Sequence, residues 1–105
     1  PPKDGIADTI QNLANLGVSL KMITGDNRLV AANIAKQVGL NTQLIITGQD
    51  LRNMTHEALV HQIQKASVFA EIEPNQKERI VRGCQQAGNV VGYMGDGIGR
   101  CRYFR

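Results

Sequence analysis

The 105-residue sequence contains no tryptophan, four other aromatic residues and two cysteines. Two cysteines cannot build the multiple disulfides that hold many small secreted domains together, so a disulfide scaffold is excluded. No apolar run approaches the roughly 18–20 residues of a membrane span, and no secretory signal segment is present. The apolar content of 42% argues against disorder. We therefore expect one folded domain, a cytosolic piece of a longer chain.

The net charge of +3 is not spread along the chain. Residues 1–98 contain nine Lys or Arg and nine Asp or Glu, so the excess comes from Arg100, Arg102 and Arg105. The basic helix or stripe that is typical of nucleic-acid binding is therefore missing, and we expect no nucleic-acid partner. We interpret residues 1–98 as the domain and residues 99–105 as a non-native tail.

Short apolar runs alternate with segments that repeat apolar residues at helical spacing. The runs predict strands at 18–23, 43–46, 67–70 and 89–94, and helices are expected before, between and after the first three of them. Residues 48–53 are expected to form a loop. Strands that alternate with helices are typical of a parallel sheet with helices on its faces. The sequence therefore predicts an α/β fold with an open sheet.

Local signals mark the helix ends. Gly17 and Gly39 are expected as stops after the first two helices, Thr55 as the N-cap of the third and Pro74 in the first turn of the fourth. The residues expected to face inward are Val30, Ile34 and Val38 in the second helix and Val81 and Cys84 in the fourth.

Three features converge on the carboxyl edge of the sheet, where open α/β folds bind their ligands. They are Thr24-Gly25-Asp26, Lys77 and Gly95-Asp96-Gly97. Each also has an ordinary interpretation: a capped turn, a lysine that extends to solvent, and a tight turn. Together they supply a hydroxyl and amides for phosphate, an ammonium for its charge and a carboxylate for Mg²⁺. Such a set would stabilise a transferring phosphoryl group.

The remaining chemically active side chains give weaker signals. His56 and His61 are five residues apart and do not share a helical face, so we expect both at the surface. Cys84 is expected to be a small core residue rather than a nucleophile. Cys101 lies in the tail, and no spacing typical of a metal site is present.

These motifs resemble a known family. Thr24-Gly-Asp26, Phe69-Ala-Glu-Ile-Glu-Pro-Asn-Gln-Lys77 and Gly95-Asp-Gly97, in this order and spacing, are similar to the phosphorylation domain of P-type cation-transporting ATPases, within the haloacid dehalogenase-like superfamily. Pro1-Pro2-Lys3 resembles the end of that family's Asp-Pro-Pro-Arg hinge. The resemblance covers residues 1–98 and is closest to the magnesium-type pumps.

The resemblance implies a Rossmann-like three-layer sandwich and a Mg²⁺-dependent ATPase cycle through an aspartyl-phosphate. Thr24 and Gly25 match the phosphate-binding motif, Lys77 the lysine that neutralises the phosphate, and Asp96, between Gly95 and Gly97, the Mg²⁺ ligand. Asp26 would orient its loop. ATP would be the parent's substrate, and the parent's nucleotide-binding and transmembrane domains the partners of this cytoplasmic domain of a plasma- or inner-membrane protein.

Two departures limit the implied activity. The phosphorylated Asp-Lys-Thr-Gly-Thr motif is missing, and Gly99-Arg100 stands where the family's last motif continues with Asn-Asp. We therefore expect this chain alone to be an inactive, soluble monomer. Because the family's central strand is absent, we expect a short, mostly parallel sheet in which 18–23 lies beside 67–70 and the last strand pairs with one of them.

Two alternatives remain open on the sequence. The first is a soluble haloacid dehalogenase-like phosphatase with the same pocket. The second is a non-catalytic phosphate-binding or interaction module.

Overall fold

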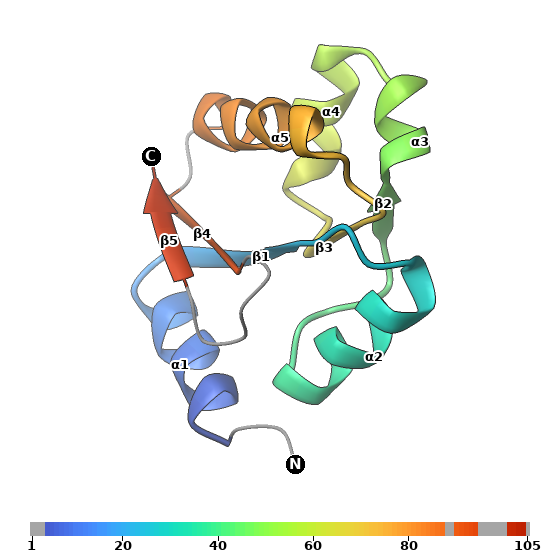
Figure 1. The fold of residues 1–105 in the computed structure, drawn as a ribbon. Helices are drawn as coiled ribbons and strands as arrows, with labels where there is room; N and C mark the ends of the chain where they lie inside the picture. The colour runs from blue at the N-terminus through green and yellow to red at the C-terminus, as the bar shows by residue number, and fades with distance from the viewer. Residues whose placement is uncertain (1–3, 88–89, 95–100, 105) are drawn as a thin grey trace.

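The computed structural model describes residues 4–87, 90–94 and 101–104. Its helices and strands follow the expected alternation. In chain order they are α1 (Asp4–Asn15), β1 (Val18–Ile23), α2 (Arg28–Val38), β2 (Ile45–Thr47), α3 (Gly48–Arg52), α4 (His56–Ile63), β3 (Val68–Ala70), α5 (Pro74–Gln86), β4 (Val90–Met94) and β5 (Cys101–Phe104). Helices α1 and α2 cover one face of the sheet and α3, α4 and α5 the other, so the expected three-layer α/β fold is confirmed (Figure 1).

The five strands form one sheet in the order β2-β3-β1-β4-β5. The first three pairings are parallel, and β5 runs antiparallel to β4. Strand β1 lies beside β3, as expected, and its other edge pairs directly with β4 over five residues. Direct pairing with β4 satisfies backbone groups of β1 that a gap would leave without partners.

The expected loop at 48–53 is wrong, because residues Gly48–Arg52 form α3. A capping box starts this short helix: the Thr47 hydroxyl accepts from the Asp50 N–H, and the Asp50 carboxylate accepts from the Thr47 N–H. At its other end, the Arg79 guanidinium donates to the carbonyls of Leu51 and Met54. These side-chain bonds stabilise a helix too short to persist alone.

The inward faces of two helices agree with expectation in part. Helix α2 buries Val38, as expected, together with Ala31 and Ala35; Ile34 is partly buried against the core, whereas Val30 is 41% exposed. Small alanine side chains let the helix approach the sheet closely, which a search for large apolar residues overlooks. Helix α5 buries Ile80, Gly83 and Cys84, and Val81 is only half-buried.

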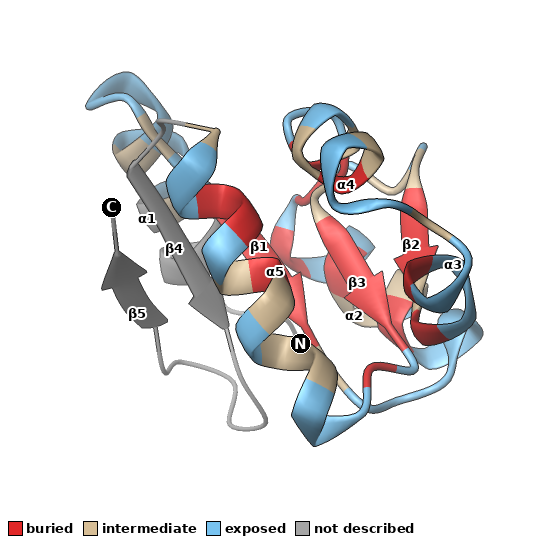
Figure 2. Ribbon diagram, turned by 90° about the horizontal axis from the view of Figure 1, so that it is seen from above, coloured by how far each residue is buried: buried red, intermediate tan, exposed pale blue. Residues whose placement is uncertain are grey.

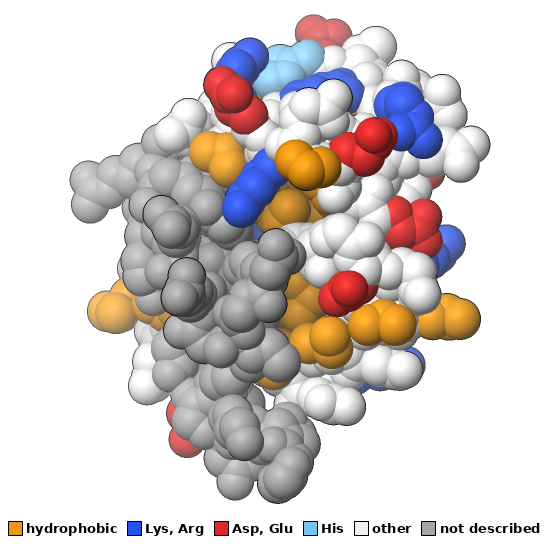
Figure 3. Space-filling model, viewed as in Figure 1, with side chains coloured by type: hydrophobic (Ala, Val, Ile, Leu, Met, Phe, Trp, Pro, Cys, Tyr) orange, Lys and Arg blue, Asp and Glu red, His pale blue; other side chains and the backbone are white. Residues whose placement is uncertain are grey.

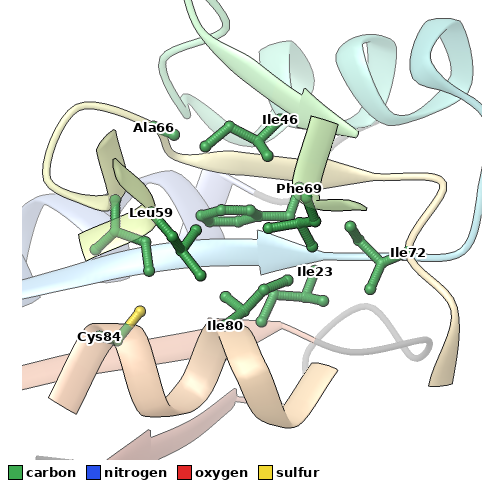
Figure 4. Close-up of a cluster of buried hydrophobic side chains, with 10 residues drawn as sticks. Ile23, Ile46, Leu59, Ala66, Phe69, Ile72, Ile80 and Cys84 are labelled. Atoms are coloured by element: carbon green, nitrogen blue, oxygen red, sulfur yellow. The ribbon is translucent and has the colours of Figure 1, made fainter. Parts of the chain in front are cut away.

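Two apolar clusters fill the spaces on either side of the sheet. Strand β3 is buried at all three positions and β1 at its last four, as expected for parallel strands covered on both faces (Figure 2). The cluster beneath α3, α4 and α5 consists of Ile23, Ile46, Leu51, Leu59, Ile63, Ala66, Phe69, Ile72, Ile80 and Cys84 (Figure 4). The cluster on the other face consists of Leu20, Met22, Ala31, Ala35, Val38, Leu40, Ile45, Val68 and Ala70.

A lysine is buried within β1, which the sequence analysis did not anticipate. The Lys21 side chain lies on the α4 and α5 face and is 5% exposed. Its Nζ donates to the carbonyl of Ile63 at 2.8 Å and to that of Ala66 at 2.7 Å, at the C-terminal end of α4. Burial lowers the pKa of Lys21, and the nearby Cys84 thiol partly opposes this shift.

Arg79→Ala should lower the free energy of unfolding by about 1–3 kcal/mol, because two carbonyls at the end of α3 lose a charged donor. Arg82→Ala on the same helix is the matched control: among the described residues Arg82 pairs with exposed Glu78 alone, and its loss should cost about 0.5 kcal/mol or less. Urea unfolding followed by circular dichroism measures both. Equal losses would show that Arg79 does not hold α3.

Cys84 should make the protein less stable in alkali. Burial raises the pKa of its thiol from 9.0 to about 11, so the unfolded chain releases the proton first as pH rises. Stability from this group is therefore complete below pH 9 and declines as pH rises toward 11; between pH 8 and 10 the loss is about 1 kcal/mol. Urea unfolding of the native chain and of Cys84→Ala at pH 8 and pH 10 measures this loss. The difference in free energy of unfolding between the two proteins should shrink as pH rises, and a constant difference would contradict the burial argument.

Candidate functional site

A pocket of about 250 Å³ opens where β1 and β3 end. It is lined by Ile23, Thr24, Gly25, Ile72, Glu73, Pro74 and Lys77. The structure thus brings Lys77 beside Thr24 and Gly25, which precede it by more than 50 residues in sequence. Gly95, Asp96 and Gly97 lie outside the described residues, and their assignment stays a prediction from the sequence.

The loop between β1 and α2 is fixed by its own polar side chains. The Thr24 hydroxyl donates to Asp26 Oδ2 and accepts from the Asp26 N–H, both at 3.1 Å. This reciprocal pair is a common turn motif of short polar residues. Asp26 is therefore engaged in holding the loop that presents Thr24 and Gly25.

The first amides of α2 are already paired within the protein. The Val30 N–H donates to Asn27 Oδ1 at 2.9 Å, and the Arg28 N–H donates to Glu71 Oε2 at 3.0 Å. Within the described ranges, the Gly25 N–H has no hydrogen-bond acceptor. An anion in the pocket would therefore meet the Gly25 amide rather than these two amides of the helix.

Three backbone hydrogen bonds join the loop after β1 to β3 and to the loop that follows β3. The Thr24 N–H donates to the Phe69 carbonyl at 2.9 Å, and the Ile72 N–H donates to the Thr24 carbonyl at 3.0 Å. The Glu71 N–H donates to the Asp26 carbonyl at 2.8 Å. Glu71 has a φ of +55°, in the left-handed region that non-glycine residues rarely adopt. These bonds therefore hold the two loops together beside the pocket.

Gln76 connects the start of α5 to the end of β2. Its Oε1 accepts from the Glu73 N–H and its Nε2 donates to the Gly48 carbonyl, both at 2.9 Å. Gly48 lies so close to the neighbouring loop that a Cβ built on it would be 2.4 Å from the Glu71 carbonyl oxygen. The sequence analysis missed Gln76, although Glu73 followed three positions later by glutamine at a helix start is a recognisable capping pattern.

Lys77 is half-buried near the start of α5 and lines the same pocket as Thr24. Glu73 also lines the pocket, and its Oε1 pairs with Arg52 Nη1 at 2.7 Å. Figure 3 shows that acidic and basic side chains alternate over α3, α4 and α5 on this face. The charge near the pocket is therefore local and mixed.

Three of the side chains that gave weaker signals in the sequence lie outside the pocket. His56 and His61 are exposed on α4, and His56 Nε2 lies against Gln86 Oε1. Cys84 is fully buried, which confirms that it is a core residue. In the part of the chain that is described, no group of three or more His, Cys, Asp or Glu could hold a metal ion, and no helix is long and apolar enough to cross a bilayer.

The sequence is similar to known proteins over most of its length. The sequence model of the haloacid dehalogenase-like hydrolases matches residues 1–100. The chain is 41% identical over 98 residues to a P-type magnesium-transporting ATPase of Salmonella typhimurium and 39% identical to one of Escherichia coli. It is 37% identical to a calcium-transporting ATPase of Yarrowia lipolytica. Each comparison covers 93% of this chain, which spans only 11% of the length of these relatives.

Gly48→Ala should destabilise the protein by about 1–3 kcal/mol, because the new methyl group meets a backbone oxygen that no rotamer change can move. Gly25→Ala is the matched control, since its Cβ would lie 3.5 Å from the Ile72 carbonyl oxygen, an ordinary contact. We expect a change of about 0.5 kcal/mol or less there. Thermal unfolding of both variants tests this contrast, and equal stabilities would contradict the close approach at Gly48.

Proposed function

Because the chain belongs to the haloacid dehalogenase-like hydrolase family, we propose that it is part of the phosphorylation domain of an ATP-driven membrane cation pump. One observation carries the proposal: Thr24, Gly25 and Lys77 line a single pocket at the carboxyl ends of β1 and β3. The similarity to magnesium- and calcium-transporting ATPases over 93% of the chain supports a pump rather than a soluble phosphatase.

In the proposed site, three groups bind the transferring phosphoryl group. The Gly25 N–H would donate a hydrogen bond to its oxygens, the Thr24 hydroxyl would turn its one proton from Asp26 Oδ2 to a phosphate oxygen, and the Lys77 ammonium would neutralise part of the charge. Asp26 would not bind the phosphate, since two anions repel, and its N–H would keep its bond to the Thr24 oxygen. Electrostatic stabilisation and positioning are the main contributions a protein makes to phosphoryl transfer.

Mg²⁺ is the cofactor we propose, with Asp96 as its ligand. In the sequence Asp96 follows β4 by two residues; a carboxylate is a suitable hard ligand, and its neighbours Gly95 and Gly97 carry no side chains that would compete for the metal. Strand β4 runs parallel to β1, so its carboxyl end lies at the same edge of the sheet as Thr24. When bound, the metal would neutralise phosphate oxygens and help to orient them.

The parent protein would phosphorylate an aspartate from ATP and hydrolyse the aspartyl-phosphate in a cycle that drives cation transport. The nucleophile's Asp-Lys-Thr-Gly-Thr motif is not among these 105 residues, so the chain on its own should not turn over ATP. The nucleotide-binding and transmembrane domains of the parent would be its partners, with this domain on the cytoplasmic side of the membrane.

The test is a titration of the ¹⁵N-labelled chain with inorganic phosphate and Mg²⁺, followed by amide NMR. We expect shifts at Gly25 and in the first turn of α5, and Lys77→Ala should weaken phosphate binding about tenfold because a charged donor is lost. Lys65→Ala, at an exposed position after α4, is the matched control and should bind as the native chain does.

Two results would overturn the proposal. The first is a native chain whose Gly25 and Lys77 regions do not respond to phosphate. The second is Mg²⁺-dependent ATPase turnover by the purified chain, which would require a nucleophile other than the missing aspartate.

A further inference from the structure

We propose that Glu71 is a positioning residue that holds the two sides of the phosphate pocket together. The inference rests on the proposed function, because it assigns Glu71 a role in phosphate binding without contact to phosphate. Glu71 lies immediately after β3 and is not among the residues that line the pocket. It acts through the loop that presents Thr24 and Gly25.

The pocket has one side from each of two loops. Thr24 and Gly25 come from the β1–α2 loop, whereas Lys77 is carried by the helix that follows the β3–α5 loop. Glu71 connects them at two points. Its N–H donates to the Asp26 carbonyl at 2.8 Å, and its Oε2 accepts from the Arg28 N–H at 3.0 Å. Glu71 thus holds the residue before Asn27 through its backbone and the residue after Asn27 through its carboxylate.

The backbone of Glu71 has little freedom to adjust. Its φ of +55° is one that glycine adopts readily and glutamate rarely does. Its carbonyl oxygen faces Gly48, where even a methyl group would approach within 2.4 Å. A non-glycine residue keeps such a conformation only where its surroundings fix it. The carboxylate bond to Arg28 is one of the interactions that do so.

The Glu71 carboxylate also determines which amides remain for a ligand. It occupies the first amide of α2, at the positive end of the helix dipole. A phosphate in the pocket is thereby directed to the Gly25 amide and Lys77. If Glu71 acted only through its charge, its removal would strengthen phosphate binding by relieving repulsion. If it acts by positioning, removal weakens binding, so the two roles predict opposite signs.

The first experiment measures the contact without any ligand. Amide hydrogen exchange of Arg28 should accelerate about tenfold in Glu71→Gly, which accepts the left-handed φ but lacks the carboxylate. Glu71→Gln retains an oxygen at the same reach and should stay within about threefold of the native rate. Glu78→Gln, which removes an exposed charge on α5, is the control. Unchanged exchange at Arg28 in Glu71→Gly would overturn the proposal.

The second experiment is the inorganic phosphate titration, read at the Gly25 amide. Glu71→Gly should weaken binding about fivefold, and Glu71→Gln should restore it to within about twofold of the native chain. Native or tighter binding by Glu71→Gly would overturn the positioning role. A native chain that binds no phosphate would instead overturn the proposed function, and with it the role of Glu71 in binding. Arg28 exchange would then still decide whether the carboxylate holds the loop.

Discussion

The parallel pairing of β1 with β3 is the interaction on which the pocket depends. The register places Ile23 opposite Phe69, so the chain leaves both strands at the same height in the sheet. The hydrogen bonds of Thr24 to Phe69 and Ile72 continue this pairing past the strand ends. Because the pairing extends into the loops, Gly25 and the helix that carries Lys77 are held as part of the sheet rather than as free connections.

The buried Lys21 connects this sheet to the helical layer above it. A cation in the core is costly unless its hydrogen-bond donors are satisfied. The Lys21 ammonium donates to the carbonyl of Ile63, the last residue of α4, which has no partner within the helix, and to that of Ala66 in the segment that follows. One side chain therefore satisfies a helix-end carbonyl and ties α4 to β1, three residues before Thr24. Burying the Lys21 ammonium costs desolvation energy, and its hydrogen bonds hold α4 in one position.

Local sequence signals predicted much of the fold. The strand at Val18–Ile23 and the N-cap at Thr55 could be predicted from adjacent residues alone, and the structure confirms both. The left-handed Gly39, whose N–H donates to carbonyls of α2, is confirmed as a helix stop. The convergence of Thr24 with Lys77 also followed from one rule, that parallel strands end at a common edge.

The features that sequence reasoning missed depend on contacts between distant segments. Glu71 meets Arg28 across 43 residues and Lys21 meets Ile63 across 42, and no local periodicity encodes either contact. Two inward residues of α2 were missed because alanine gives a weak apolar signal, although Ala31 and Ala35 are completely buried. Helix α3 was missed for another reason: its capping box is local, but a five-residue helix needs support from Arg79 that the sequence does not reveal.

The charges around the pocket suggest why this part of the site is incomplete by itself. Phosphate groups carry about −1.5 to −2 charges near pH 7, and Lys77 supplies one positive charge. Arg52 is already paired with Glu73 at the rim, so its charge is largely balanced there. A second cation would therefore be needed at the same edge of the sheet. Strand β4 runs parallel to β1 and ends at the same edge of the sheet, and in the sequence Asp96 follows it by two residues; in the site we propose, a Mg²⁺ ion bound by Asp96 would supply the missing charge.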